Sequence, residues 1–456
     1  MKKLRLFDLA WPIFVEVALF MLLGFVDVIV LSKYDDLAAS SVNTANQAVS
    51  IVTIVFTVIS GASAVLISQY LGAKKRENAS RIAAVSIAFN LVTGIIISLL
   101  LVIFSRPVLS FVGAKGAVMD FASQYLSIVG GSLFFQAVLS AAAVIVRNHG
   151  LTRITMYVSA GMNILNTGLD VVFVPGLFGM PKMGVMGVAL ATAVSRFGGT
   201  VVILAILFKK VEPPSVFRLL RPFPFGDICD IIRIGVPSAL ETFLYNLSQL
   251  VITSMVLRYL TSTELITKTY VQNITMFFYI FAVSIGQASQ IMTGHLVGAR
   301  RFEKAYYRVY SAYLYALGIS MAVCMTGVIF RRQLMGIFTA DMAVIEMGSN
   351  ILMINIILEL GRTTNLVIIS SLRGAGDVYY PTACAIFSMW VISVLGSYVL
   401  ALGFGLGIYG LWIAIAMDEC VRGGLMIWRW KSGRWKAKAI VRNKEKRQLE
   451  AGKAVS

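Results

Sequence analysis

Charge is scarce in this chain. Only 14% of its 456 residues are Asp, Glu, Lys or Arg, whereas a soluble domain carries about 25%. Hydrophobic residues make up 58% of the chain, more than the interior of a water-soluble protein of ordinary size can bury. This composition excludes a soluble enzyme, a disordered chain and a coiled coil. It indicates an all-α polytopic membrane protein with about 12 transmembrane helices of roughly 20 apolar residues each.

Cysteine and histidine are also rare. The four cysteines have the spacing of neither a zinc site nor a CxxC redox pair: Cys229, Cys324, Cys384 and Cys420. The two histidines, His149 and His295, lie near basic segments, so we expect no histidine metal site. A Walker A sequence is missing as well, which argues against ATP as the energy source. We therefore expect no enzymatic activity and no cofactor.

Positive charge is distributed unevenly along the chain. The net charge is +18, and Lys and Arg gather around residues 74–81, 209–233 and 300–308 and after residue 422. If the N-terminus is inside, these basic segments all fall on the cytoplasmic side, and both termini are cytoplasmic. Basic residues placed in this way are topology signals, so we expect a cell (plasma or inner) membrane protein that binds no nucleic acid.

The two halves of the sequence repeat each other. Trp11-Pro12 with Glu16 recurs as Val236-Pro237 with Glu241, and residues 69–77 recur as 295–303. Arg147 and Gly150 match Arg373 and Gly376 at the same offset. Parallel repeats predict two pseudo-symmetric six-helix bundles, an arrangement that suits alternating access and that a duplicated channel or scaffold would also have. The expected limits are an N-terminal lobe over 1–208, a cytoplasmic linker over 209–229, a C-terminal lobe over 230–430 and a basic cytoplasmic tail over 431–456.

Ionisable residues inside apolar runs are the candidates for function, because burying them in a membrane is expensive. Asp27 lies deep in the first run, and Asn163, Asn166 and Asp170 follow at i, i+3 and i+7 on one face of the fifth. Together they could hold Na⁺ through oxygen ligands, or share a proton. Asn163 and Asn166 could instead only hydrogen-bond between helices. Asp27 corresponds to Ile252 in the second half, so the acidic site is confined to the first.

The second half has its own intramembrane charges. Glu359 and Arg362 are placed at i and i+3, where they can form an ion pair. We expect a structural charge network of Glu359, Arg362 and Asp418, with Arg422 as a further candidate. For Glu16 and Glu241, which the repeat retains in both halves, a structural and a functional role are equally open.

The sequence resembles the multidrug and toxic compound extrusion (MATE) family over nearly its whole length. The residues that carry the resemblance are Trp11-Pro12 with Asp27, Gln69-Tyr70-Leu71-Gly72-Ala73, Asn166 with Asp170, the stretch 184–192 and the stretch 372–377. The resemblance implies two six-helix lobes in a V. It also implies, for prokaryotic DinF-like more than NorM-like members, coupling roles for Asp27, Asn166, Asp170 and Thr192. Val28 departs from the threonine that often follows the helix-1 aspartate, and Glu241 stands before the position of a key second-lobe glutamate.

We therefore predict a secondary active multidrug exporter. It would exchange small organic or hydrophobic cations for Na⁺ or H⁺ across the bilayer, and act as a monomer. Asp27, Asn166 and Asp170 would be the metal ligands only if Na⁺ is the coupling ion. Two alternatives remain: a lipid-linked oligosaccharide flippase of the same superfamily, which needs a cationic cavity, and a non-transporting membrane subunit.

Overall fold

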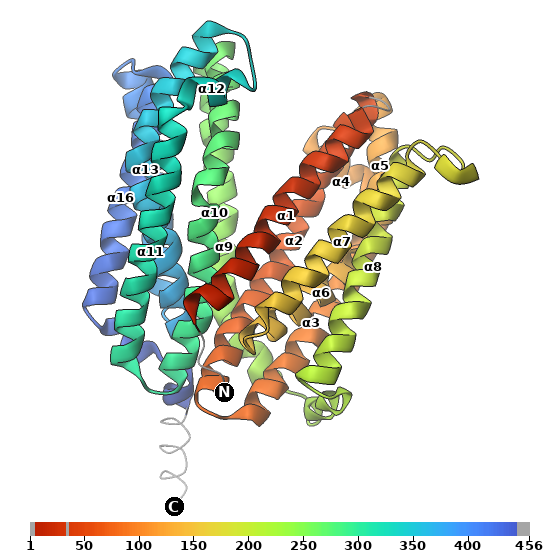
Figure 1. Cartoon of the computed structure of the whole chain (residues 1–456), viewed down its shortest axis with the longest axis vertical. Coiled ribbons are helices and arrows are strands. Elements are labelled where there is room, and N and C mark those ends of the chain that lie inside the picture. Colours follow the sequence, from red (N-terminus) through yellow and green to blue (C-terminus); the bar gives the residue numbers. More distant parts are fainter. Residues whose placement is uncertain (1–4, 33–35, 445–456) are drawn as a thin grey trace, which may run out of the picture. The chain divides into compact units, whose positions relative to one another are not determined.

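The chain is helical throughout its described part. The computed structural model describes residues 5–32 and 36–444, except the side chains of residues 22–32, 36 and 178. All regular elements in these ranges are helices (Figure 1). Twelve helical segments match the twelve apolar runs: α1 (Leu6–Ser32), α2 (Asp36–Gly72), α3 (Arg76–Ile103), α5 and α6 (Gly116–Gly131 and Leu133–Asn148), α7 (Thr152–Phe173), α8 (Val185–Lys210), α9 (Phe225–Tyr259), α10 (Ser262–Gly298), α11 (Phe302–Ile329), α13 (Met342–Ala375), α14 to η4 (Tyr379–Gly403) and α16 (Gly407–Lys431).

Length and composition support membrane crossing for most of these segments. Among the described residues, eight helices are long and apolar enough to span a bilayer, and the pair α5/α6 makes a ninth. That pair bends by 45° at Ser132. The bend follows Gly130-Gly131, which have no side chains to stiffen the helix. The prediction of an all-α polytopic membrane protein is confirmed.

Short elements fill the connections and the second half of the eleventh span. They are α4 (Ser105–Val112), η1 (Leu177–Gly179), η2 (Pro214–Leu220), α12 (Arg331–Gly336), α15 (Leu395–Ser397) and η5 (Arg434–Lys438), with π-helical turns η3 (Met389–Val394) and η4 (Tyr398–Gly403). π-helical turns inside a helix leave backbone groups out of the regular ladder and often mark functional positions.

The chain divides into two compact units. The first is formed by Trp11–Ile67 and Lys75–Gly235 and is called the N-unit below. The second, the C-unit, is formed by Met1–Ala10, Ser68–Lys74 and Val236–Ser456. The last turn of α2 therefore belongs to the C-unit. The limits expected from the sequence for the two lobes and the linker remain predictions.

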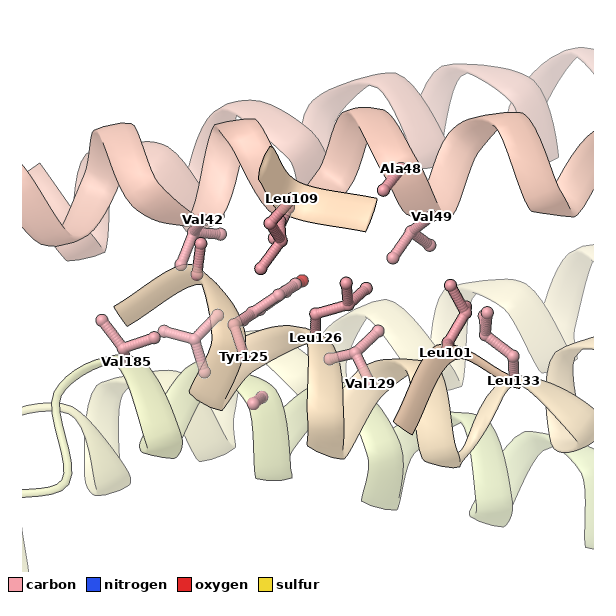
Figure 2. Close-up of a cluster of buried hydrophobic side chains, with 14 of the residues drawn as sticks. Val42, Ala48, Val49, Leu101, Leu109, Tyr125, Leu126, Val129, Leu133 and Val185 are labelled. Atoms are coloured by element: carbon pink, nitrogen blue, oxygen red, sulfur yellow. The ribbon is translucent and has the colours of Figure 1, made fainter. Parts of the chain in front are cut away.

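The N-unit is held together by a dry core between α2, α3, α5 and α8. Figure 2 shows Val42 and Val49 of α2 facing Tyr125, Leu126 and Val129 of α5. The Tyr125 hydroxyl donates to Asn46 Oδ1 at 3.0 Å, so the polar end of this buried ring has a partner. Because lipid chains are as apolar as these side chains, close van der Waals packing between the helices is what stabilises this core.

The C-unit has a second core and a folded C-terminal segment. α10, α13 and α16 pack on one another around Ile252, Ile351 and Trp412. Residues 434–444, which belong to the stretch expected as a basic cytoplasmic tail, lie against this unit. Trp435 is fully buried, its ring stacks on Trp430 with centroids 4.2 Å apart, and its Nε1 donates to the Trp430 carbonyl at 2.9 Å.

The ends of α2 and α10 approach each other at backbone distance. A Cβ at Gly72 would collide with the carbonyl oxygen of His295, and a Cβ at Gly298 would collide with that of Gln69. Only glycine permits this approach. It brings the last turn of α2 onto α10 within the C-unit.

Candidate functional site

The predicted polar residues of the N-unit line one face of α7. Asn163, Asn166 and Asp170 are all buried, and Asp170 is not exposed at all. Asn166 Nδ2 lies 3.5 Å from Thr192 Oγ1 on α8, and the Thr192 hydroxyl donates to the Val188 carbonyl at 2.9 Å. α7 and α8 pack side by side, which holds these groups together. The three side chains spaced i, i+3 and i+7 on α7 are thus all buried, as expected for one inward face of the helix.

Asp27 is the remaining predicted member. It lies on α1, whose backbone is helical there, but its side chain is outside the described residues. Its place beside Asn166 and Asp170 therefore stays a prediction.

The group on α7 and α8 has the chemistry of a cation or proton site. It offers carboxylate, amide and hydroxyl oxygens, which are ligands of hard cations such as Na⁺. A buried carboxylate can equally take up a proton, because desolvation disfavours its charged form. Among the described side chains, no three of His, Cys, Asp and Glu gather as they would around a transition metal. The C-unit has no counterpart, since Ile252 lies in its apolar core at the position that corresponds to Asp27.

Comparison with known proteins decides the family. The family model described as MatE matches residues 12–172 and 237–399, one match in each half of the chain. The chain belongs to the MATE family. An uncharacterized transporter of Bacillus subtilis, YisQ, is 37% identical over 96% of both chains. A probable multidrug resistance protein of Thermotoga maritima, NorM, is 27% identical over 98% of this chain and 96% of its own.

Solved structures show the same fold. The crystal structure of the Vibrio cholerae MATE transporter VcmN, as its D35N mutant, matches with a TM-score of 0.87 at 18% identity, over 94% of this chain and 97% of the other. This MATE protein is therefore a multi-pass secondary transporter of a multidrug-efflux family and not an enzyme. The DinF-like rather than NorM-like pattern of its motifs stays a prediction.

In the C-unit, the predicted intramembrane charges form the ion pairs Glu359–Arg362 and Asp418–Arg422. Arg362 Nη1 lies 2.8 Å from Glu359 Oε1 within α13, and the Arg362 guanidinium sits 4.9 Å from the centre of the Tyr279 ring. Asp418 Oδ2 lies 2.6 Å from Arg422 Nη2 within α16, and Ser388 donates to its other oxygen. Asp418 is thus bonded to Arg422 rather than to Arg362. A single structural network of Glu359, Arg362 and Asp418 stays a prediction.

A repeated trio of polar residues escaped the sequence argument. In the C-unit, Glu241 Oε2 lies 2.7 Å from Arg373 Nη2 and accepts from the Thr382 hydroxyl at 2.9 Å. In the N-unit, Glu16 Oε2 lies 3.5 Å from Arg147 Nη1 and 3.2 Å from the Thr155 hydroxyl. The sequence repeat matches Glu16 to Glu241 and Arg147 to Arg373, but nothing in it said that these residues touch.

The repeat itself contained the missing signal. The glutamate, the arginine and the threonine recur in the second half with almost the same separation. Each half can therefore form the same contacts between a glutamate and its arginine and threonine partners. Each trio joins the first helix of a six-helix repeat, which contains Pro12 or Pro237, to the junction between its fourth and fifth spans. Charged hydrogen bonds of this kind contribute about 1.5–3 kcal/mol each.

His149 lies outside the membrane spans, at the end of α6. Its Nδ1 is 2.9 Å from the Ile145 carbonyl and its Nε2 is 3.7 Å from Glu212 Oε1. Burial lowers the pKa of His149 below 6.5, although the hydrogen bond to Ile145 and the charge of Glu212 oppose the shift. The imidazole is therefore neutral near pH 7.

Proposed function

We propose that this MATE protein exports small organic cations by alternating access, in exchange for Na⁺ or H⁺ bound in its N-unit. Asp27 and Asp170 would take the ion, with Asn166 and Thr192 as neutral ligands. The observation that carries the proposal is the buried face of α7, where Asp170 and Asn166 lie with Thr192 of α8. Neutralising the carboxylates in one state and not in the other would let the ion drive the drug outward, because only unequal binding shifts a conformational equilibrium.

The charge of the intramembrane residues favours cation export over a flippase. A pyrophosphate-linked substrate needs uncompensated positive charge. Three arginines in the spans of the C-unit are each paired with an acid, Arg362 with Glu359, Arg422 with Asp418 and Arg429 with Asp377, while the buried Lys268 of α10 donates to Thr253 and Gln272. The net charge that the three ion pairs contribute to the interior is therefore close to zero. Family membership likewise favours a transporter over a non-transporting subunit.

Orientation follows from the basic segments. Both termini would be cytoplasmic, with the loops after α2 and after α10 on the same side. In a cysteine-free background, Lys75→Cys should react with a membrane-impermeant maleimide only after permeabilisation. Labelling in intact cells would reverse the proposed topology.

Transport by inverted membrane vesicles tests the function and names the ion. Uptake of a fluorescent organic cation is measured under a Na⁺ gradient and, separately, under a H⁺ gradient. One of the two gradients should drive accumulation of the cation, and vesicles without a gradient should accumulate none. The proposal would be contradicted if the cation accumulates under neither gradient although the protein is present at its normal level.

Asp27→Asn and Asp170→Asn test the coupling site. Each change keeps size and hydrogen bonding but removes the ionisable group, so gradient-driven uptake should fall at least tenfold at matched expression. Asp27→Glu should keep partial activity. Asp120→Asn is the matched control, because Asp120 is an exposed N-unit aspartate that pairs with Arg106 at the surface. Wild-type transport by Asp27→Asn would refute the coupling role of Asp27.

A further inference from the structure

A basic cavity lies in the C-unit, at the ends of α2 and α10. It has a volume of about 340 Å³. Its walls come from three segments of the C-unit: residues 69–74 at the end of α2, residues 297–301 at the end of α10, and residues 439–442 after α16. The transport argument above uses none of them.

Four cations line this cavity, and none of its lining residues is acidic. They are Lys74, Arg300, Arg301 and Arg442. Within the described residues, no carboxylate lies within ion-pair distance of Lys74, Arg301 or Arg442. Elsewhere in the C-unit, arginines such as Arg373 and Arg429 have carboxylate partners at 2.7 Å. Unneutralised positive charge converging on one cavity is what an anion requires.

The cavity has a rigid frame. Gln69 is fully buried, donates through Nε2 to the Gly374 carbonyl at 2.9 Å and accepts from the backbone N–H of Ile440 at 2.9 Å. That second bond ties the C-terminal segment to the end of α2, while Ala439 and Val441 bury their side chains beside it. Arg442 therefore follows an anchored backbone, and its approach to the cavity is fixed by the fold.

The two loops that present the other cations hold strained backbones. Lys74 has φ 61° and Arg300 has φ 59°, in the left-handed region that residues with a Cβ rarely adopt. Such conformations are unfavourable for residues with a side chain and persist where the surroundings impose them. Topology alone asks only for positive charge on one side of the membrane. It does not require segments more than 130 residues apart to direct that charge into one cavity.

We propose that this cavity binds a phosphate group, either in the headgroup of an anionic phospholipid or in a soluble phosphate compound. The volume equals roughly ten waters, at about 30 Å³ each, which accommodates a phosphate with its substituent. Lys and Arg side chains supply the charge-assisted hydrogen bonds that phosphate oxygens accept. The cavity lies at helix ends, the level at which lipid headgroups meet a membrane protein, and basic pockets between spans are known to hold such headgroups.

Binding to purified full-length protein in a neutral detergent tests the proposal. Dioleoylphosphatidylglycerol, dioleoylphosphatidylcholine and inorganic phosphate are titrated separately, and the apparent Kd is taken from the rise in Tm. The key variant is Lys74→Gln/Arg301→Gln/Arg442→Gln. Each neutralised charge should weaken binding about fivefold, which corresponds to about 1 kcal/mol per basic residue, so the triple variant should bind about a hundredfold more weakly.

The matched control is Lys209→Gln/Lys210→Gln/Arg218→Gln, which removes the same charge from exposed positions of the N-unit. It should bind as the wild type does. Stabilisation by phosphatidylglycerol alone assigns the site to a lipid headgroup, and stabilisation by inorganic phosphate assigns it to a soluble compound. The proposal is overturned if neither probe raises Tm more than phosphatidylcholine does, or if both triple variants bind equally. Should the key variant not fold, Arg442→Gln alone must still weaken binding about fivefold relative to Lys210→Gln.

Discussion

Replacing Arg362 by methionine should destabilise the C-unit strongly, because it leaves the buried carboxylate of Glu359 without a charged partner. Glu359 is fully buried, and Arg362 Nη1 at 2.8 Å is its charged partner. Among the described residues, its second oxygen makes no hydrogen bond. Methionine keeps much of the volume of the arginine stem but none of its charge. Breaking such a pair from one side costs about 3–5 kcal/mol.

Protonation sets the upper limit of this cost. At pH 7 a glutamate with an ordinary pKa of about 4.3 takes up a proton at a cost of about 3.7 kcal/mol, at about 1.36 kcal/mol per pH unit. A loss of about 3 kcal/mol lowers Tm by roughly 6–12 °C for a unit of about 200 residues.

Thermal denaturation in detergent at pH 7.5 measures this loss. The double variant Glu359→Gln/Arg362→Met should recover most of the lost Tm. Glu359→Gln alone should be milder than Arg362→Met, because Arg362 is partly exposed and keeps its contact with the Tyr279 ring. An Arg362→Met protein as stable as the wild type, or a double variant no better than the single one, would refute the reasoning.

Three further outcomes follow from the contacts described above. Glu241→Gln should lower stability by about 2 kcal/mol and Glu16→Gln by about half as much, because the Glu241 bonds are shorter; equal Tm losses would contradict this ranking. The lowered pKa of His149 means that, as pH falls through 6.5, the unfolded chain binds a proton that the folded one does not. Stability should then drop between pH 7.5 and 5.5, and His149→Gln should flatten that Tm profile. Trp435→Ala should remove about 3–5 kcal/mol of buried packing and speed tryptic cleavage after Lys436, whereas Trp428→Ala, at a half-exposed ring, should leave the cleavage rate near that of the wild type.

The spans were predictable because hydrophobicity in a membrane protein is a local property. One such apolar run forms α10, Ser262–Gly298, and a capping box between Thr261 and Glu264 marks its start in the sequence. The bend at Ser132 was missed because hydropathy averages across Gly130-Gly131 without registering a break.

The contacts between helices were less predictable. Asn163, Asn166 and Asp170 could be placed on one face from their spacing, since the helix period fixes it. The partner of Asp418 could not, because α16 offers Arg422 one turn away while Arg362 lies on another helix. Choosing between them needs the rotation of α13 against α16, which depends on packing over the whole interface. The folding of residues 434–444 onto the C-unit was hidden for the same reason, since Trp435 finds its partner only in three dimensions.

The crossing of α2 and α10 has the form of a twofold dimer contact. Gly72 meets the backbone of His295, and Gly298 meets the backbone of Gln69. In the sequence repeat, Gly298 corresponds to Gly72 and His295 corresponds to Gln69. The contact of Gly72 with His295 is therefore the same contact as that of Gly298 with Gln69, with the two halves exchanged. This reciprocity defines an isologous interface. In a homodimer, one codon would specify both sides and any change would appear twice. Here the two sides have separate codons, and the chain has kept glycine in both while giving glutamine to one and histidine to the other. The glutamine side anchors the C-terminal segment through Ile440, an asymmetry that two identical subunits could not encode.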